Sequence, residues 1–228
     1  MAEAQPCLRV EQLGFHWPSG QMALQGCSFT IPRPGLWMLV GGNGSGKSTL
    51  LRLIAGLLEP HSGVLRTPLK PALVFQNPDH QLLLPSCGSD VELSLPPGLD
   101  RGERLKAVEQ ALQQVGLATF RQRPIHSLSG GQKQRLAIAG ALASHGDLLL
   151  LDEPTALLDE TSQREVLQLI HSLCNRCDQP ITALWVTHRL EELQWCDGAA
   201  LVEAGRVGPW QSGAVLRQRL RPLAAGKG

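Results

Sequence analysis

A glycine-rich segment at residues 41–48 constrains the fold of this 228-residue chain more than any other feature of its sequence. The segment reads GGNGSGKS, and it lies between an apolar run at residues 36–40 and a helical pattern at residues 47–58. Glycines allow backbone N–H groups to surround phosphate oxygens, and the N-terminus of the following helix adds a partial positive charge. The order of strand, glycine loop and helix therefore predicts a phosphate-binding loop at one edge of a parallel sheet.

Individual members of this loop have separate expected roles. Lys47 is expected to reach the β and γ phosphates of a nucleotide, and the Ser48 hydroxyl is expected to ligate Mg²⁺. The complete set expected around the nucleotide is Gly41, Gly42, Asn43, Gly44, Ser45, Gly46, Lys47, Ser48 and Thr49. Taken alone, the loop is compatible with a kinase, a GTPase or any of several ATPases.

Apolar patterns along the rest of the chain predict an α/β fold. Alternation at residues 8–17 and 24–31 predicts antiparallel strands, and apolar spacing at residues 103–115 predicts a helix. Short apolar runs that predict buried parallel strands occur at residues 36–40, 72–76, 148–153 and 181–188. We expect one domain over residues 1–228, with a parallel-sheet core and a helical insertion at about residues 85–145.

Charge and hydropathy exclude several classes of protein. A formal net charge of +1 provides no basic surface for nucleic acid or for an anionic membrane. The N-terminus carries an acid where a signal peptide needs a basic start, and no apolar run approaches the ~20 residues that span a bilayer. We therefore expect a cytoplasmic chain that reaches a membrane only through a partner.

The six cysteines are scattered along the chain, which favours a reducing compartment over a disulfide-stabilised fold. His171, Cys174 and Cys177 are spaced three residues apart on what the sequence predicts to be one helix. A zinc site would need a fourth ligand and usually a second pair of cysteines. We expect these cysteines to be buried or half-exposed on a helix rather than to bind metal.

An apolar run that ends in two acids, LLLLDEP at residues 148–154, narrows the choice of chemistry. A buried strand would bring Asp152 next to the glycine loop, where its carboxylate can hold Mg²⁺ through water. Glu153, one residue further on, can then polarise an attacking water. On its own such a pair would be read as a solvated strand end, and its combination with the phosphate loop favours a catalytic role.

A second glycine pair opens a second helix in LSGGQKQR, residues 128–135. A helix that begins at this point presents free N–H groups, a hydroxyl and a positive dipole end, a combination that suits an anion. The spacing is also compatible with an ordinary helix cap.

The motifs GGNGSGKS, LSGGQKQR, LLLLDEPT and VTH, in this order, resemble the nucleotide-binding subunit of an ABC (ATP-binding cassette) protein. The resemblance covers nearly the whole chain. It implies the ABC ATPase fold, an α/β P-loop NTPase core with a parallel sheet, an N-terminal antiparallel β subdomain and a helical signature subdomain. It also implies ATP hydrolysis with Mg²⁺ and a dimer in which two such domains meet head to tail.

Roles for single residues follow from this resemblance. Trp17 matches the aromatic residue that stacks on adenine, Gln76 matches the glutamine that touches Mg²⁺ and the attacking water, and His188 matches the switch histidine at the γ phosphate. Asp159 matches the aspartate of the loop that crosses the dimer interface, where Leu157 replaces the small residue usual in the family. The signature residues expected to close over the γ phosphate of the other subunit are Ser129, Gly130, Gly131 and Gln132.

A finer likeness indicates an importer. VFQNPDHQ and SGGQKQRLAIAG are similar to segments of the ATPases of energy-coupling-factor and cobalt or nickel importers. This likeness implies a transmembrane partner at the inner face of the cell membrane, a second ATPase subunit of the same or another kind, and uptake of a vitamin or transition-metal ion. The apolar run HQLLLP at residues 80–85 would either line the groove for that partner or pack into its own core. The alternative is a soluble ABC ATPase in a non-transport assembly, such as iron–sulfur cluster biogenesis.

Overall fold

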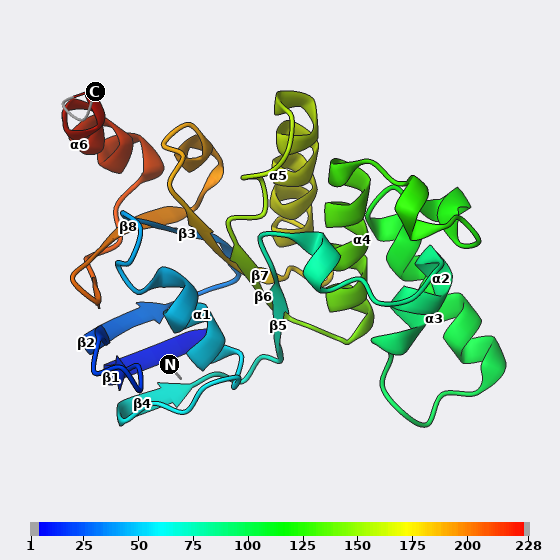
Figure 1. Ribbon diagram of the computed structural model, residues 1–228, viewed down its shortest axis with the longest axis horizontal. Helices are drawn as coiled ribbons and strands as arrows, with labels where there is room; N and C mark the ends of the chain where they lie inside the picture. The colour runs from blue at the N-terminus through cyan, green and yellow to red at the C-terminus, as the bar shows by residue number, and fades with distance from the viewer. Residues whose placement is uncertain (1–4, 226–228) are drawn as a thin grey trace.

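The structure is a computed structural model that describes residues 5–225, with side chains as far as Arg221. Residues 1–4 and 226–228 lie outside the described part. The prediction that the N-terminus is not a signal peptide and the predicted domain limits at residues 1 and 228 fall partly on these residues. Figure 1 shows a small sheet at one end of the molecule, a cluster of helices at the other and a larger sheet between them.

The small sheet is antiparallel, as the alternating apolar pattern predicted. Its strands are β1 (Leu8–His16), β2 (Met22–Ile31) and β4 (Ser62–Arg66), in the order β2-β1-β4. Leu8 pairs with Ile31 and Val10 pairs with Phe29, so the buried side chains of neighbouring strands lie on one face. This face packs against the helix that follows the glycine loop.

The larger sheet has six strands in the order β5-β6-β7-β3-β8-β9. Their bounds are β3 (Gly35–Val40), β5 (Pro71–Val74), β6 (Leu148–Asp152), β7 (Thr182–Thr187), β8 (Gly198–Glu203) and β9 (Arg206–Val207). All neighbours are parallel except β9, which is antiparallel to β8. Because β3, β6 and β7 are parallel neighbours, their carboxyl ends meet at one edge of the sheet.

The helices fall into two groups. Three of them lie between β5 and β6 in the sequence, namely α2 (Cys87–Leu93), α3 (Arg101–Gln114) and α4 (Gly130–Ala143). The others are α1 (Lys47–Ile54), α5 (Glu160–Cys174) and α6 (Gly213–Ala225), and short 3-10 turns are η1 (Pro78–His80), η2 (Ala118–Phe120), η3 (Ile125–Ser127) and η4 (Glu192–Trp195). Among residues 5–225, every helix is too short or too polar to cross a membrane.

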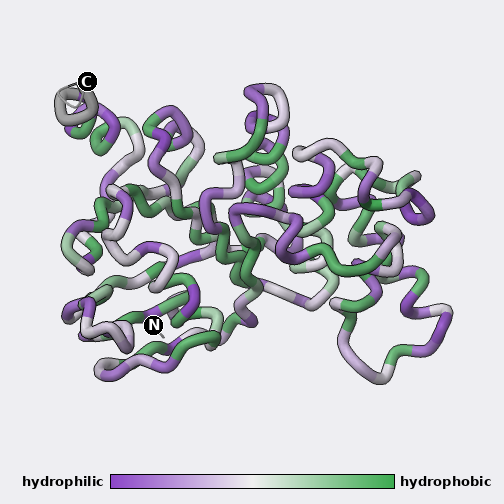
Figure 2. Tube along the Cα trace, viewed as in Figure 1, coloured by the Kyte–Doolittle hydropathy of each residue, from purple (hydrophilic) through white to green (hydrophobic). Residues whose placement is uncertain are grey.

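Two hydrophobic cores lie on opposite faces of the larger sheet. Alternate residues of β6 divide between them, with Leu149 and Leu151 in one core and Leu148 and Leu150 in the other. One core packs against α2 to α5, and the other against α1 and the small sheet. The central strands are accordingly the most continuously hydrophobic part of the trace in Figure 2. Burial on both faces explains why the strand sequences read as unbroken apolar runs.

Two of the predicted elements end earlier in the structure than the sequence pattern indicates. The helix expected at residues 47–58 ends at Ile54, because Gly56 adopts a left-handed conformation with φ of 71° that stops it. The strand expected at residues 72–76 ends at Val74.

The prediction that His171, Cys174 and Cys177 share one helix is wrong for Cys177. Helix α5 ends at Cys174, and Cys177 lies in the exposed turn that follows. Cys174 is buried, and burial raises the pKa of its thiol to about 12. It is therefore inert as a nucleophile near neutral pH.

Candidate active site

The glycine loop joins the end of β3 to the start of α1, as the sequence predicted. Gly46 immediately precedes the helix and has φ of 102°, a conformation that side chains disfavour. A Cβ at Gly41 would collide with the carbonyl oxygen of Val202 on the neighbouring strand. Glycine at these two positions therefore allows the loop to turn tightly above the sheet.

Lys47 is the first residue of α1 and is only 5% exposed. Its Nζ donates hydrogen bonds of 2.8 Å to the carbonyl oxygens of Gly41 and Gly42. Burial lowers the pKa of this ammonium group, while the nearby carboxylates of Glu153 and Asp152 act in the opposite direction. The loop thus holds one buried cation beneath its backbone N–H groups.

Asp152 ends β6 and faces the loop. Its Oδ1 accepts a hydrogen bond of 2.9 Å from the Ser48 hydroxyl. Burial raises the pKa of this carboxyl group, and the bond from Ser48 opposes the rise. A carboxylate and a hydroxyl held side by side provide the oxygen ligands that Mg²⁺ prefers, so these residues fit the metal that the sequence predicts here.

Glu153 has an unusual backbone conformation, with φ of 48°. Its N–H donates to the carbonyl oxygen of Val186 on β7 at 3.0 Å, which holds the turn at the end of β6. Its Oε2 lies 3.0 Å from Nδ1 of His188, which follows β7. Left-handed non-glycine residues cost free energy and concentrate at functional sites. The strand ends therefore bring an acid and an imidazole together beside the phosphate loop.

A cavity of about 400 Å³ is lined by most of the nucleotide-site residues that the sequence predicts. It is lined by Trp17, Gln76, Asp152, Glu153 and residues 43–49. Edge-to-face contact with Phe15, at 5.2 Å between ring centroids, fixes the Trp17 ring at its rim.

Sequence reasoning missed three further lining residues, Gln21, Met22 and Ala23. A turn closed by the hydrogen bond from Trp17 N to Gln21 O brings the start of β2 to the same cavity as Trp17. The segment PSGQMA at residues 18–23 separates the two strands predicted at residues 8–17 and 24–31, and its proline and glycine carried that signal, because they are typical of hairpin turns.

The signature residues lie elsewhere. Ser129 caps α4, and its side chain and that of Gln132 exchange hydrogen bonds with each other's backbone N–H groups at 3.3 and 3.0 Å. A Cβ at Gly131 would come within 2.6 Å of the Ser162 hydroxyl, so only glycine permits this approach of α4 to α5. Within the described chain, residues 129–132 and Asp159 do not line the cavity that contains Lys47.

Asp159 caps α5 beside the signature residues. It accepts hydrogen bonds from the N–H and the hydroxyl of Ser162, at 3.0 and 2.7 Å. These bonds lower the pKa of its carboxyl group. Through Ser162, the cap of α5 and the start of α4 form one continuous surface.

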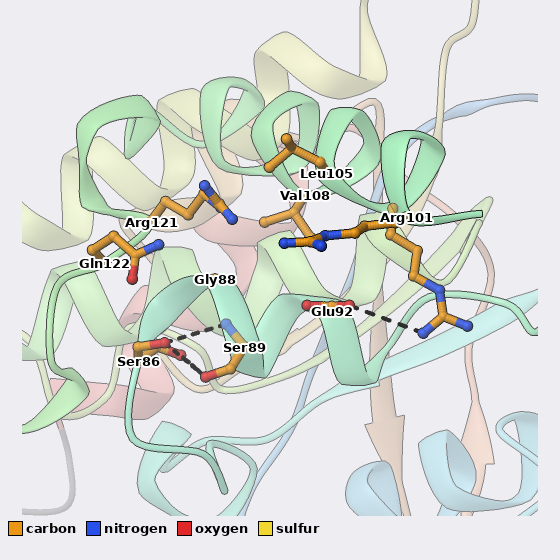
Figure 3. A pocket seen from close by; sticks show the side chains of 10 residues that line it. Ser86, Gly88, Ser89, Glu92, Arg101, Leu105, Val108, Arg121 and Gln122 are labelled. Atoms are coloured by element: carbon orange, nitrogen blue, oxygen red, sulfur yellow. Dashed lines mark hydrogen bonds and ion pairs between the residues drawn. The ribbon is translucent and has the colours of Figure 1, made fainter. Parts of the chain in front are cut away.

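A second hollow of about 330 Å³ lies between α2 and α3 (Figure 3). It is bordered by Arg101, Arg104 and Arg121, and Arg104 approaches Glu92 at 3.9 Å. None of the predicted site residues lines it. It is distinct from the nucleotide cavity.

Replacing Asp152 with asparagine is expected to stabilise the ligand-free chain at neutral pH. Burial raises the pKa of the Asp152 carboxyl group in the folded chain above its unfolded value of 3.8. The group therefore contributes most to the free energy of unfolding when the pH is below 3.8. This contribution is lost as the pH rises through the folded pKa, so the buried charge is unfavourable at pH 7. Scanning calorimetry should show a higher Tm, by ~2–4 °C for each kcal/mol recovered.

The exposed Asp178 supplies the matched control, since Asp178→Asn makes the same chemical change in solvent. Its Tm at pH 7 should equal that of the natural chain. A lower Tm for Asp152→Asn at pH 7 would show that the carboxylate stabilises the loop.

Comparison with known proteins places the chain in a family. The family model described as ABC transporter matches residues 24–156. "ABC transporter I family member 10" of Arabidopsis thaliana is 50% identical over 186 residues, 81% of this chain and 69% of that protein. "Energy-coupling factor transporter ATP-binding protein EcfA1" of Geobacillus kaustophilus is 40% identical, over 90% of this chain and 78% of that protein.

A solved structure agrees with this placement. It is that of cbiO1 from Clostridium perfringens, described as part of the ABC transporter complex cbiONQ. Its TM-score is 0.85 at 31% identity, and the match covers 98% of this chain and 96% of that one. The α/β ABC ATPase fold expected from the sequence is confirmed. This chain therefore belongs to the ABC transporter family, as an ATP-binding ATPase similar to those of energy-coupling-factor transporters.

Proposed function

We propose that this chain is the ATP-hydrolysing subunit of an importer, a single ABC domain with a helical insertion at about residues 85–145. It pairs with a second ATPase subunit around ATP and drives a transmembrane partner that takes up a vitamin or a transition-metal ion. The contact between Glu153 and His188, beside Lys47 and Asp152, is the observation that carries the proposal. This contact supports hydrolysis, because an acid and a hydrogen-bonding imidazole lie beside the loop that would hold the phosphates of a nucleotide.

In the proposed reaction, the loop N–H groups of residues 43–49 and the Lys47 ammonium bind the phosphates. Glu153 accepts a proton at a carboxylate oxygen from water, whose oxygen forms a bond to the γ phosphorus as the bond to the bridging oxygen breaks. His188 orients Glu153 and contacts the γ phosphate. The products are ADP and phosphate.

Mg²⁺ is part of this proposal. Ser48, Asp152 and Gln76 would hold it, and when bound it neutralises the charge that develops on the phosphate oxygens. The hydrogen bond from Ser48 to Asp152 supports this assignment, because it holds the oxygen atoms of two of these side chains close together. Trp17, at the rim of the same cavity, presents a ring face for the adenine.

The dimer in this proposal is head to tail. The signature residues Ser129, Gly130, Gly131 and Gln132, together with Asp159, lie outside the cavity of their own chain. Ser129 and Gly130 are exposed at the N-terminus of α4, whereas Gly131 is buried. A second subunit that brings this surface over the nucleotide would complete the phosphate site. ATP would then hold the two subunits together, and hydrolysis would release them. Leu157, 62% exposed, lies close to Asp159 in the sequence and would be covered in the dimer.

The partner in the membrane is supported by an exposed apolar surface. Leu83 is 71% exposed, whereas Leu82 and Leu84 are half-buried. The HQLLLP run is therefore partly packed into the core and partly exposed to solvent. A hollow of about 430 Å³ beside it is lined by Leu84, Leu93, Leu95, Pro96 and Pro97, with Ser89, Glu92 and Arg104 at its border. An apolar surface of this kind suits a helix from a membrane subunit at the inner face of the membrane.

Recovery of the tagged chain from mildly solubilised cells of its source tests the proposal. Multi-span membrane proteins should copurify, and Leu83→Asp should remove them by placing a charge in the apolar contact. Val215→Asp is the matched control, because Val215 is also an exposed apolar residue, 54% exposed, but lies on α6. Recovery of soluble partners only, in repeated preparations, would overturn the importer and favour a non-transport assembly.

A further inference from the structure

Glu192, the first residue of η4, is a buried carboxylate that the proposed chemistry does not use. It is only 3% exposed. Burial of a carboxylate costs several kcal/mol unless its oxygens are hydrogen-bonded, and removing one of its partners is strongly destabilising. A chain keeps such a group where it connects segments that must be held together.

The bonds of Glu192 account for both of its oxygens. Oε1 accepts from the Thr155 hydroxyl and lies 3.8 Å from Nε of Arg189. Oε2 accepts from the indole N–H of Trp185 at 3.0 Å. Thr155 is 1% exposed and Trp185 is fully buried, so solvent cannot replace these bonds.

The partners of Glu192 belong to the two segments that carry the proposed chemistry. Thr155 lies two residues after Glu153, in the connection from β6 to α5. Trp185 lies on β7, and Arg189 directly follows His188. Glu192 is therefore bonded to both segments behind the contact between Glu153 and His188.

We infer that Glu192 is a positioning residue, which fixes the segment after Glu153 against the segment that carries His188. This inference rests on the proposed function, because it assigns Glu192 to the geometry of those two residues. The left-handed backbone of Glu153 needs support on its C-terminal side, and the bond to Thr155 supplies it two residues away. Loss of the bond would displace the carboxylate of Glu153 while the phosphate loop stayed intact.

Thr155→Val in the full chain tests the inference, because valine keeps the shape and removes only the hydroxyl. We expect kcat for ATP hydrolysis to fall about tenfold or more, since a displacement of 1 Å can cost 100-fold. KM and the calorimetric affinity for ATP should change by less than about twofold, because Lys47 and the loop are untouched. Thr155→Ser, which restores the hydroxyl, should recover kcat.

Thr182→Val is the matched control. Thr182 is a buried threonine on the same strand as Trp185, 1% exposed, and its hydroxyl has no hydrogen-bond partner among the described residues. The same atom is removed there without breaking a bond, so kcat and KM should equal those of the natural chain. Glu192→Gln provides a second approach: its amide replaces one acceptor by a donor, and it should lower kcat with unchanged ATP affinity.

The outcomes separate this inference from the proposed function. If Glu153→Gln abolishes hydrolysis while Thr155→Val and Glu192→Gln retain natural kcat, the positioning role is wrong and the proposed chemistry stands. If Thr155→Ser fails to recover kcat, the hydroxyl is not the cause and the inference is also overturned. If Glu153→Gln itself remains fully active, the proposed chemistry is wrong, and the inference that rests on it is overturned as well.

Discussion

Replacing Glu153 with glutamine should lower kcat for ATP hydrolysis by at least about 100-fold, the contribution of a positioned general base. Glutamine retains the size of the side chain and its contact distance to His188, but it cannot accept the proton of the attacking water. The affinity for ATP should stay close to that of the natural chain, because Lys47 and residues 43–49 are unchanged. Single-turnover hydrolysis and calorimetric titration with ATP measure the two quantities separately.

The same variant should accumulate as an ATP-bound dimer. If the signature residues of one subunit complete the phosphate site of another, an intact γ phosphate keeps the subunits together. Light scattering should give twice the 24.6 kDa mass of the chain under saturating ATP and Mg²⁺. A monomer under these conditions would contradict the completion of the site in trans.

Glu109→Gln is the matched control for both experiments. Glu109 is an exposed glutamate on α3, away from the surface formed by the cap of α5 and the start of α4. The substitution removes the same charge from solvent, so hydrolysis should proceed at the natural rate and the dimer should dissociate after turnover.

Replacing Lys47 with alanine should weaken ATP binding by about 100-fold, because a hydrogen bond to a charged group contributes ~1.5–3 kcal/mol. Lys47 is buried, and its ammonium already lies beneath the loop, 2.8 Å from the carbonyl oxygens of Gly41 and Gly42. The variant removes the cation that would face the phosphates and also leaves these two carbonyl groups without their donor. The first effect weakens ATP binding, and the second lowers the stability of the loop.

Calorimetric titration with ATP and Mg²⁺ gives this affinity, and a thermal melt verifies that the variant is folded. Lys106→Ala, which removes an exposed lysine of α3, should bind ATP like the natural chain. Unchanged affinity for Lys47→Ala would mean that the phosphates bind somewhere other than the glycine loop.

The sequence predicted those parts of the molecule in which a local rule and the tertiary structure agree. The apolar run at residues 148–151 became β6 because it is buried on both faces, which removes any need for alternation. The loop at residues 41–48 formed between strand and helix because its glycines allow a conformation that few other residues adopt. The expected roles of Asp152 and Ser48 agree with their direct hydrogen bond, although the roles themselves stay predictions.

Other features depend on contacts between distant residues and left no local pattern. Glu192 looks like an ordinary polar residue in the segment LEELQW, and its burial depends on Thr155, 37 positions earlier. The place of Gly131 against Ser162 likewise reflects the packing of two helices from separate motifs. The end of α1 was misplaced because the apolar residues after Gly56 continue a helical spacing that the backbone does not follow.

The division of β6 and β7 between two cores has a consequence for how this chain can change during evolution. Leu149 and Trp185 face the side of α2 to α5, whereas Leu150 and Leu184 face the side of α1 and the small sheet. Substitutions on opposite faces of one strand have few shared neighbours, so their effects on stability should combine nearly additively. Substitutions in the core on the helical side should therefore have little effect on the packing that supports the nucleotide loop on the other side.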